Sequence, residues 1–384
     1  MSWECKTVEK LREEFVQAAA NGEKISKLCR EFGISRPTAY KWMKRAQAGE
    51  SMSDQSRRPK QIANRVAAHV EEKVLEMRTA NPGWGGKTIH AVLQREGYPD
   101  LPCAKTCDNI LKRNGRIDPE ESAKHKAYLR FQKEQCNQMW QTDFKGDFPL
   151  KGKSRCHILN ILDDHSRFCI KSLPFTSTRG VVIPAFEAAF REFGMPDSVL
   201  SDNGCQFAGF RHGYTQFERW LMDLDILPIH SRIKHPQTQG KIERFHRTLE
   251  QELLRHFSFD KVEDVDAKLQ PWREKYNHIR PHTALHMQCP GDVYVPSLRT
   301  YPTAIQPVQY GGGYHVVKVN SWGYVRFANF QIYLSETMRG AFIEFRPSDH
   351  DEVFLACYRN FVIAKFSAIS GELLSRSIFR LTNV

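Results

Sequence analysis

The chain has 384 residues, of which 41% are hydrophobic, and its formal net charge is +12. This length predicts two to four domains, and the positive charge favours nucleic acid as the partner. The N-terminus lacks the apolar core of a signal peptide, and the most apolar helical segment is short and contains Glu187. The ten cysteines have no framework spacing. These features exclude membrane-spanning and disulfide-rich secreted proteins and predict a cytoplasmic protein.

Residues 1–47 predict a helical DNA-binding domain. Two helices end at Gly22 and Gly33, and a third begins in "SRPTAYKW", where Ser35 is suited to cap the helix and Pro37 fits its first turn. Two short helices around a Gly turn are typical of a helix-turn-helix. Its predicted DNA contacts are Arg36, Thr38, Tyr40, Lys41 and Lys44. The alternative is a three-helix packing unit with a solvated basic face.

Residues 48–61 form a polar linker that ends in a basic arm. The sequence "RRPK" is the type of extended segment that enters a minor groove. We therefore predict DNA contacts for Arg57, Arg58 and Lys60. A charge run that only solvates the linker is the alternative interpretation.

The pattern of residues 62–116 predicts a second helix-turn-helix-like domain. Residues 117–134 are predicted to form a connecting helix. Three helical segments are separated by Gly-marked turns, and Pro82 ends the first of them. The basic character of this region is weaker than that of residues 1–47. Two such domains on a flexible link can read a longer DNA site than one domain alone.

From residue 135 the pattern changes to mixed α and β structure. The segment "MWQTDFKGDF" alternates as a strand does, and "CHILNILDDHSRFCIKSLPF" is a hairpin of two apolar runs around an Asp-Asp-His-Ser turn. Helices and strands then alternate and two helices follow, the last with a possible break at Pro271. This order predicts a layered α/β domain with a mixed sheet over 135–295. Residues 305–384, rich in aromatic and β-branched residues, predict a small antiparallel barrel or sheet.

Three acidic residues of the α/β domain are candidates for chemistry. Asp143 lies in a strand among hydrophobic residues, where Asp is disfavoured. Asp202 follows the apolar "SVL" at the end of a strand, where open α/β sheets bind ligands. Glu243 lies near the start of a helix in the basic segment "HPQTQGKIERFH". Each has a structural alternative, since Asp202 can form a turn and Glu243 can pair with Arg247.

Together these carboxylates predict a metal site. Carboxylate oxygens are the ligands that Mg²⁺ and Mn²⁺ prefer, and a pair of such ions activates an attacking hydroxyl and stabilises a leaving oxygen at phosphorus. An acid in a basic segment is explained if Glu243 holds a cation beside bound phosphates. Asp163 and Asp164 form a competing pair, but they occupy a predicted hairpin turn, where Asp is common, and we interpret them as structural.

The motifs "WQTDFKG", "ILDDHSR", "SDNGCQF" and "HPQTQGKIERFHRTLEQE" resemble the catalytic core of bacterial insertion-sequence transposases with a retroviral-integrase-like, ribonuclease-H-like fold. The resemblance covers roughly residues 135–295. It implies that Asp143, Asp202 and Glu243 are a catalytic triad that binds two Mg²⁺ ions, with Mn²⁺ as a substitute. It also implies DNA contacts close to the active site, for which the candidates are Gln239, Lys241, Arg244 and Arg247.

One departure from the family pattern is visible between the last two acids of the triad. The separation of Asp202 and Glu243, 243 − 202 = 41 residues, is a few residues longer than the commonest spacing. The segment "RHGYTQ" has the character of a loop insertion. It weakens the alignment of residues 208–216 but leaves the triad in place.

The resemblance implies a transposase that binds the ends of a mobile element, cleaves phosphodiester bonds and joins the freed 3′-hydroxyl to target DNA. Its expected partners are double-stranded DNA, as terminal inverted repeats and as target, and further copies of the chain in a dimer or tetramer on DNA, with no membrane involved. The expected location is the bacterial cytoplasm, in association with the nucleoid. The alternative, of another class, is a domesticated transposase that regulates DNA without catalysis. The intact triad favours the enzyme.

Overall fold

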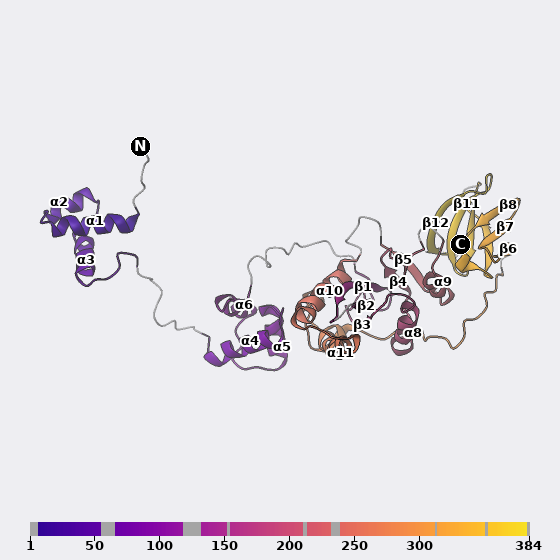
Figure 1. Ribbon diagram of the computed structural model, residues 1–384, viewed down its shortest axis with the longest axis horizontal. Helices are drawn as coiled ribbons and strands as arrows, with labels where there is room; N and C mark the ends of the chain where they lie inside the picture. The colour runs from indigo at the N-terminus through magenta and orange to yellow at the C-terminus, as the bar shows by residue number, and fades with distance from the viewer. Residues whose placement is uncertain are drawn as a thin grey trace. The chain divides into compact units, whose positions relative to one another are not determined.

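The structure is a computed structural model, and it describes residues 7–54, 66–117, 132–151, 154–209, 213–231, 239–311, 313–349 and 352–381. The chain divides into two compact units, Met1–Arg65 and Val66–Val384. Figure 1 gives the elements of both. Two predictions fall wholly or largely outside the described residues: the "RRPK" arm, and the connecting helix over 117–134, of which 118–131 are not described.

The N-terminal unit is a three-helix domain of α1 (Val8–Ala20), α2 (Ile25–Glu31) and α3 (Arg36–Gln47). The Ser35 hydroxyl accepts a hydrogen bond from the Thr38 backbone N–H at 3.4 Å, and Pro37 lies in the first turn of α3. Gly33 has a φ of +63° between α2 and α3, a conformation that favours glycine. Phe15, Leu28 and Ala39 are among the buried core residues. The predicted helix-turn-helix and its cap are confirmed.

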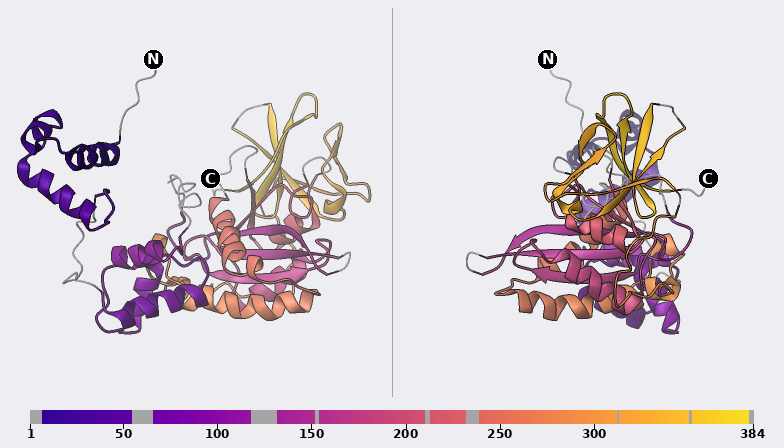
Figure 2. Two further views of the ribbon diagram at one scale, coloured as in Figure 1. Left: turned by 60° about the vertical axis from the view of Figure 1, so that its left-hand side comes forward. Right: turned by 90° about the vertical axis from the view of Figure 1, so that its right-hand side faces the viewer.

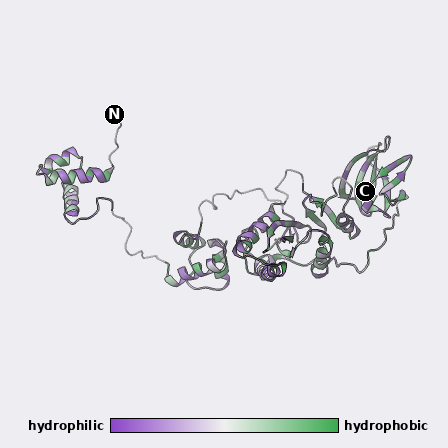
Figure 3. Cartoon of the chain, viewed as in Figure 1, coloured by the Kyte–Doolittle hydropathy of each residue, from purple (hydrophilic) through white to green (hydrophobic). Residues whose placement is uncertain are grey.

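A second three-helix module consists of α4 (Ala68–Ala80), α5 (Gly86–Arg95) and α6 (Ala104–Arg113). Its core includes Val74, Trp84, Ile89 and Ile110. Figure 3 shows apolar and polar residues interleaved along these helices, as in amphipathic elements. Each helix therefore buries one face against the other two.

The second module is attached to the central domain through the end of α5. Both oxygens of Asp292, in α12 (Pro290–Val293), accept hydrogen bonds from the Arg95 guanidinium at 3.1 and 2.9 Å. The same guanidinium lies 2.7 Å from the Cys289 thiol sulfur. The Lys275 ammonium lies over the Trp84 ring, 5.5 Å from its centre. Polar and cation–aromatic contacts thus fix this module to the central domain.

The central domain contains a five-stranded mixed sheet with the order β3-β2-β1-β4-β5. The strands β1 (Trp140–Pro149), β2 (Arg155–Asp163) and β3 (Cys169–Phe175) are antiparallel, as the predicted hairpin requires. The strands β4 (Ser198–Ser201) and β5 (Leu227–His230) extend the sheet in parallel to β1. The predicted mixed α/β architecture is confirmed.

Helices cover both faces of this sheet. Leu159 and Ile161 of β2 belong to a core that includes residues of α8 (Val182–Phe193) and α9 (Gln216–Asp223). On the opposite face, Ile158 belongs to a core that includes residues of α10 (Gly240–Glu252) and α11 (Val262–His278). Figures 1 and 2 show α8 and the pair α10 and α11 on opposite sides of the strands. The alternation of side chains along β2 thus builds a three-layer domain.

Pro271 does not break α11, contrary to the possibility raised by the sequence. The helix continues from Val262 to His278. The neighbours Leu269 and Trp272 are buried against the sheet on either side of the proline. Packing of an apolar face stabilises a helix more than a single missing backbone hydrogen bond destabilises it.

The helix α11 also covers the free edge of β3. The Asn277 side chain accepts a hydrogen bond from the Cys169 backbone N–H at 2.8 Å and donates one to the Cys169 carbonyl at 3.1 Å. The Arg273 guanidinium donates to the Ile170 carbonyl at 3.0 Å. Side chains of α11 thus satisfy backbone groups that an edge strand leaves unpaired.

The C-terminal region consists of two antiparallel sheets, with the orders β12-β11-β10-β9-β6 and β7-β8. The strands are β6 (His315–Lys318), β7 (Tyr324–Phe327), β8 (Phe330–Tyr333), β9 (Phe342–Pro347), β10 (Val353–Tyr358), β11 (Phe361–Ser367) and β12 (Leu373–Arg380). The described residues form no closed barrel, so the sheet alternative of the prediction holds. The strand β12 packs beside β5 of the central domain.

Short helical turns complete the described elements: η2 (Leu254–His256), η3 (Thr283–Leu285) and η4 (Glu336–Met338). In the part of the chain that the structure describes, none of the helices combines the length and the apolar character needed to cross a membrane.

Candidate active site

Asp143 and Asp202 come from neighbouring parallel strands at the same level of the sheet. The last paired residues of the β1–β4 ladder are Gln141 and Leu200. Asp143 lies two residues after Gln141, and Asp202 lies two residues after Leu200. Both acids are therefore near the C-terminal end of β4, where an open α/β sheet binds ligands. The Asp202 carboxylate accepts a hydrogen bond from the Gly204 backbone N–H at 2.9 Å, which shapes the turn that follows β4.

The third acid, Glu243, is delivered by the first turn of α10. It is exposed, and it lines one open pocket together with Asp143. The other residues that line this pocket are Phe144, Lys145, Gly146, His246, Arg247 and Glu250. No ion pair joins Glu243 to Arg247 among the described residues, so the structural alternative for Glu243 is not realised here.

The acids act on one another electrostatically. Burial, together with the negative charges of Asp202 and Glu243, raises the pKa of Asp143 to about 7. Like charges that approach each other in this way are a donor set suited to a hard divalent cation. The described residues nevertheless contain no group of three or more acids, histidines or cysteines already gathered with the geometry of a metal site.

Two of the predicted DNA contacts on α10 face solvent and two face inward. Arg244 and Arg247 are exposed. Gln239, at the N-cap of α10, is only 9% exposed. The Lys241 side chain is 12% exposed, and its ammonium lies 2.5 Å from a carboxylate oxygen of Asp164. The structure places the Lys241 ammonium against a carboxylate inside the protein, and its contact with DNA stays a prediction.

Asp163 and Asp164 are fully buried and do more than form a turn. Asp163 accepts hydrogen bonds from the Ser166 hydroxyl at 2.6 Å and from the Asn137 backbone N–H at 2.8 Å. Asp164 accepts one from the Gln141 side-chain amide at 2.7 Å, in addition to its ion pair with Lys241. Asp164 thus links Gln141 of β1 to Lys241 of α10. These two residues lie two positions before Asp143 and Glu243, respectively.

His246 is a site residue that the sequence interpretation missed. It lies three residues after Glu243 on α10, a spacing that places two side chains on the same helix face and is the signal by which it could have been found. Its Nδ1 lies 3.8 Å from Oδ2 of Asp143, and its Nε2 lies 3.0 Å from the side-chain nitrogen of Asn160. Burial lowers the pKa of His246 to about 3, so the ring is neutral at physiological pH.

A second polar network lies beside Asp202. The Ser201 hydroxyl is 3.1 Å from His230 Nδ1, and His230 Nε2 is 2.8 Å from a Glu218 carboxylate oxygen. This constellation has the residue types of an acyl-transfer triad. Ser201 is 2% exposed and Glu218 is 4% exposed, so no substrate reaches the hydroxyl. The network joins β4, β5 and α9 and supports the strand that leads into Asp202.

The predicted DNA contacts of the N-terminal unit lie on α3. Arg36, Tyr40, Lys41 and Lys44 are exposed there. Thr38 is half-buried, and its hydroxyl lies 2.9 Å from the Ser35 hydroxyl at the start of the helix. The other predicted contacts of this unit, Arg57, Arg58 and Lys60, lie outside the described residues.

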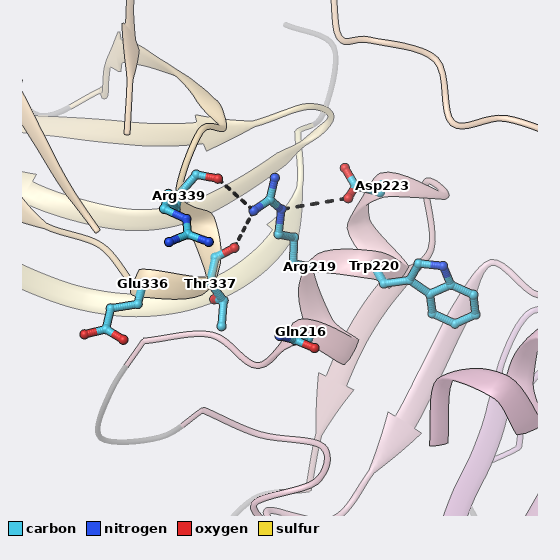
Figure 4. A pocket seen from close by; sticks show the side chains of 7 residues that line it. All are labelled: Gln216, Arg219, Trp220, Asp223, Glu336, Thr337 and Arg339. Atoms are coloured by element: carbon cyan, nitrogen blue, oxygen red, sulfur yellow. Dashed lines mark hydrogen bonds and ion pairs between the residues drawn. The ribbon is translucent and has the colours of Figure 1, made fainter. Parts of the chain in front are cut away.

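A further pocket lies between α9 and the C-terminal region (Figure 4). The Arg219 guanidinium donates hydrogen bonds to the backbone carbonyls of Thr337 and Arg339, and it lies 3.9 Å from a carboxylate oxygen of Asp223. The Asp223 carboxylate also accepts a hydrogen bond from the Tyr358 hydroxyl at 2.5 Å. These bonds hold the C-terminal region on α9 and give this pocket a structural role.

The sequence matches two family models over the central domain and one over the N-terminal unit. Both central models are described as integrase core domain, and they match residues 133–236 and 224–290. A model described as helix-turn-helix domain matches residues 11–60. The fold and these matches define a protein with an integrase core and a helix-turn-helix domain.

Similar proteins occur in bacterial insertion elements. An uncharacterized 31.7 kDa protein of insertion element IS407 from Burkholderia multivorans is 24% identical over 233 residues, which cover 57% of this chain and 78% of that protein. An uncharacterized 39.2 kDa protein of insertion element IS476 from Xanthomonas euvesicatoria is 23% identical, over 55% of this chain and 60% of its own length. The chain is thus similar to proteins of bacterial insertion elements, and its central domain matches the integrase core family.

A solved structure is also similar to part of the chain. The catalytic core domain of HTLV-2 integrase, in a structure in complex with magnesium, is 17% identical and aligns with a TM-score of 0.32. The alignment covers 42% of this chain and 97% of that one.

Proposed function

We propose that this protein cleaves phosphodiester bonds at the ends of its mobile element and joins the resulting 3′-hydroxyl groups to target DNA. The observation that carries the proposal is the convergence of three acids from separate elements. Asp143 and Glu243 line one pocket, and Asp202 lies close enough to raise the pKa of Asp143. Such an acidic centre beside exposed arginines suits chemistry on a phosphodiester.

The proposed cofactor is a pair of Mg²⁺ ions, with Mn²⁺ as a substitute, held by Asp143, Asp202 and Glu243. The residues fit this role because burial and like charge disfavour the ionised form of Asp143, which a divalent cation would relieve. The bound metal would supply the charge stabilisation at phosphorus that phosphodiester cleavage requires.

The chain's own side chains would bind and orient the DNA. Arg244 and Arg247 are exposed on α10 beside Glu243, where they can hold phosphates of the reacting strand. The exposed side chains of α3 would read the terminal repeats in the major groove. The proposed active assembly is a dimer or tetramer of the chain, because two element ends must be brought together before they are joined to one target.

The test uses the purified full chain and linear DNA that carries the sequences flanking this gene. We expect Asp143→Asn, Asp202→Asn and Glu243→Gln each to lower end cleavage and joining with Mg²⁺ by at least about a thousandfold, since each loses a metal ligand. End binding, measured by gel mobility shift, should remain within about twofold, because affinity is spread over many phosphate contacts.

The matched control is Asp147→Asn. Asp147 lies on the same strand as Asp143, but it is exposed and pairs with Arg155 instead of facing the other acids. This variant should retain normal activity. Strand transfer at the unmodified rate by any of the three triad variants would show that the triad is assigned incorrectly.

A further inference from the structure

One row of polar side chains crosses three strands directly beneath α10. Asp143 on β1 is the register partner of Asn160 on β2, and Asn160 is the register partner of Ser172 on β3. Register partners in an antiparallel ladder point to the same face of the sheet. His246 of α10 lies on this row, with one ring nitrogen toward Asn160 and the other toward Asp143.

The surroundings of Asn160 determine the orientation of its amide. Its Nδ2 lies 3.2 Å from the Ile158 carbonyl oxygen, which can only accept a hydrogen bond, so this end of the amide must be the NH₂ group. The Ser172 hydroxyl donates to Oδ1 of Asn160 at 2.6 Å on the other side. Asn160 and Ser172 are fully buried. The second N–H of the amide therefore points at Nε2 of His246, 3.0 Å away.

This hydrogen bond decides which ring nitrogen of His246 carries the proton. Because Asn160 donates, Nε2 must accept through its lone pair and carries no proton, so the single proton of the ring is on Nδ1. Nδ1 faces Oδ2 of Asp143 at 3.8 Å, which is longer than a hydrogen bond. A movement of about 1 Å would bring the pair to hydrogen-bonding distance.

We propose that His246 is a positioning residue, held by Asn160 as the Nδ1–H tautomer, which donates a hydrogen bond to Asp143 and orients that carboxylate toward the metal. The proposal rests on the proposed function, in which Asp143 is a metal ligand. In this proposal His246 is not itself a metal ligand, since a ligating imidazole needs a free lone pair. In His246 one nitrogen accepts from Asn160 and the other carries the proton. Carboxylates that hold metals are commonly oriented by such outer hydrogen bonds.

The first experiment determines the tautomer in the unmodified full chain without metal. Nitrogen NMR on protein labelled at histidine distinguishes a protonated Nδ1 from a protonated Nε2, and the His246 signal is assigned by its loss in His246→Gln. We expect protonation at Nδ1 alone near pH 7. A ring protonated at Nε2, or at both nitrogens, overturns the proposal.

The second experiment measures Mn²⁺ binding by calorimetry, without DNA. Asn160→Asp replaces the donor with an acceptor of the same shape and should move the ring proton to Nε2. We expect this variant and His246→Leu to bind Mn²⁺ roughly 10- to 100-fold more weakly. His246→Asn, whose amide can donate, should keep more of the affinity than His246→Leu.

The variant Asp143→Asn distinguishes a failure of the proposed function from a failure of the positioning role of His246. If this variant binds Mn²⁺ as tightly as the unmodified chain, the proposed function fails, because Asp143 is then not a ligand. If Asp143→Asn loses binding while Asn160→Asp and His246→Leu keep it, the positioning role of His246 fails and the proposed function stands. Circular dichroism of each variant identifies any loss of binding that comes from unfolding, and in that case the tautomer measurement on the unmodified chain decides.

Discussion

The N-terminal unit and the central domain use charged side chains in opposite ways. On α3 of the N-terminal unit, Lys41 and Lys44 are exposed to solvent. Beside the acids of the central domain, Lys241 and Asp164 are withdrawn from solvent and paired with each other. Exposed cations bind a polyanion through many contacts of similar strength, whereas buried charges depend on one specific partner. Loss of one charge should therefore weaken DNA binding modestly in the first unit and disrupt the structure in the second.

The largest expected effect comes from deletion of residues 1–65, which removes the N-terminal unit. Without α3, the protein should lose its preference for element-end DNA over unrelated DNA, a ratio that we expect to fall by about a thousandfold or more. The remaining affinity should depend steeply on salt, because it arises from counterion release. Fluorescence anisotropy with both DNAs at two salt concentrations measures this. A footprint of the shortened protein on the element ends would contradict this division of labour.

The next effect is on stability, through Asp164→Asn. This substitution leaves the Lys241 ammonium without its 2.5 Å ion pair in a buried position, and removing one partner of a buried pair typically costs about 3–5 kcal/mol. Thermal unfolding followed by calorimetry should show a clear decrease in the Tm of the central domain. An unchanged Tm would show that the pair is dispensable.

Two variants serve as controls for the Asp164 measurement. Asp164→Asn combined with Lys241→Met removes both charges and should recover part of the lost stability, since no unpaired buried charge remains. On the exposed side of the comparison, Lys44→Ala should leave the Tm unchanged. It should lower DNA affinity slightly. It should also reduce the slope of log affinity against log salt concentration by about 1, the amount due to one phosphate contact.

The smallest effect is a dependence of stability on pH that only the second unit should show. Burial of the ring and the charge of Arg280 are the leading causes that lower the pKa of His282 to about 2. Its unfolded pKa is about 6.5, so below that pH the unfolded chain binds a proton that the folded chain does not. The stability due to neutral His282 is thus present above pH 6.5 and decreases as the pH falls. Between pH 7 and 5 we expect His282 alone to account for a loss of about 2 kcal/mol.

Calorimetry at both pH values checks this expectation. In His282→Phe, which can keep ring contact with Tyr276, the loss of stability between the two pH values should be smaller by about 2 kcal/mol than in the unmodified chain. The first 65 residues contain no histidine, so the unfolding transition of that unit should not move between pH 7 and 5. A transition of that unit that moves as much as the second would remove the contrast between them.

The parts of this molecule that the sequence predicted are those that depend on local pattern. The cap at Ser35 and the hairpin through Asp163 follow from residues that are neighbours in the chain, and both are present. The order of strands and helices in the central domain follows from the alternation of apolar residues and is confirmed. A predicted turn, however, does not say where its side chains point, and Asp164 points into the protein toward Lys241.

The features that escaped prediction depend on contacts between distant segments. Lys241 lies in a basic segment, and nothing in that segment indicates a buried carboxylate contributed by the β2–β3 turn. Asn160 and His246 meet because strand register and helix packing bring them together, and neither is visible as periodicity. The local effect of Pro271 favours a break in the helix, whereas the buried face of α11 holds the helix together.

The bonds from α11 to β3 bear on how copies of this chain can associate. Asn277 occupies the backbone groups of Cys169 on one margin of the central sheet, and on the other margin β12 packs beside β5. A neighbouring chain would find neither margin open for adding a strand. Extension of the central sheet from one subunit into the next, a common route both to dimers and to aggregation, is therefore disfavoured. Copies brought together on DNA would have to meet through surfaces other than the two margins of the central sheet.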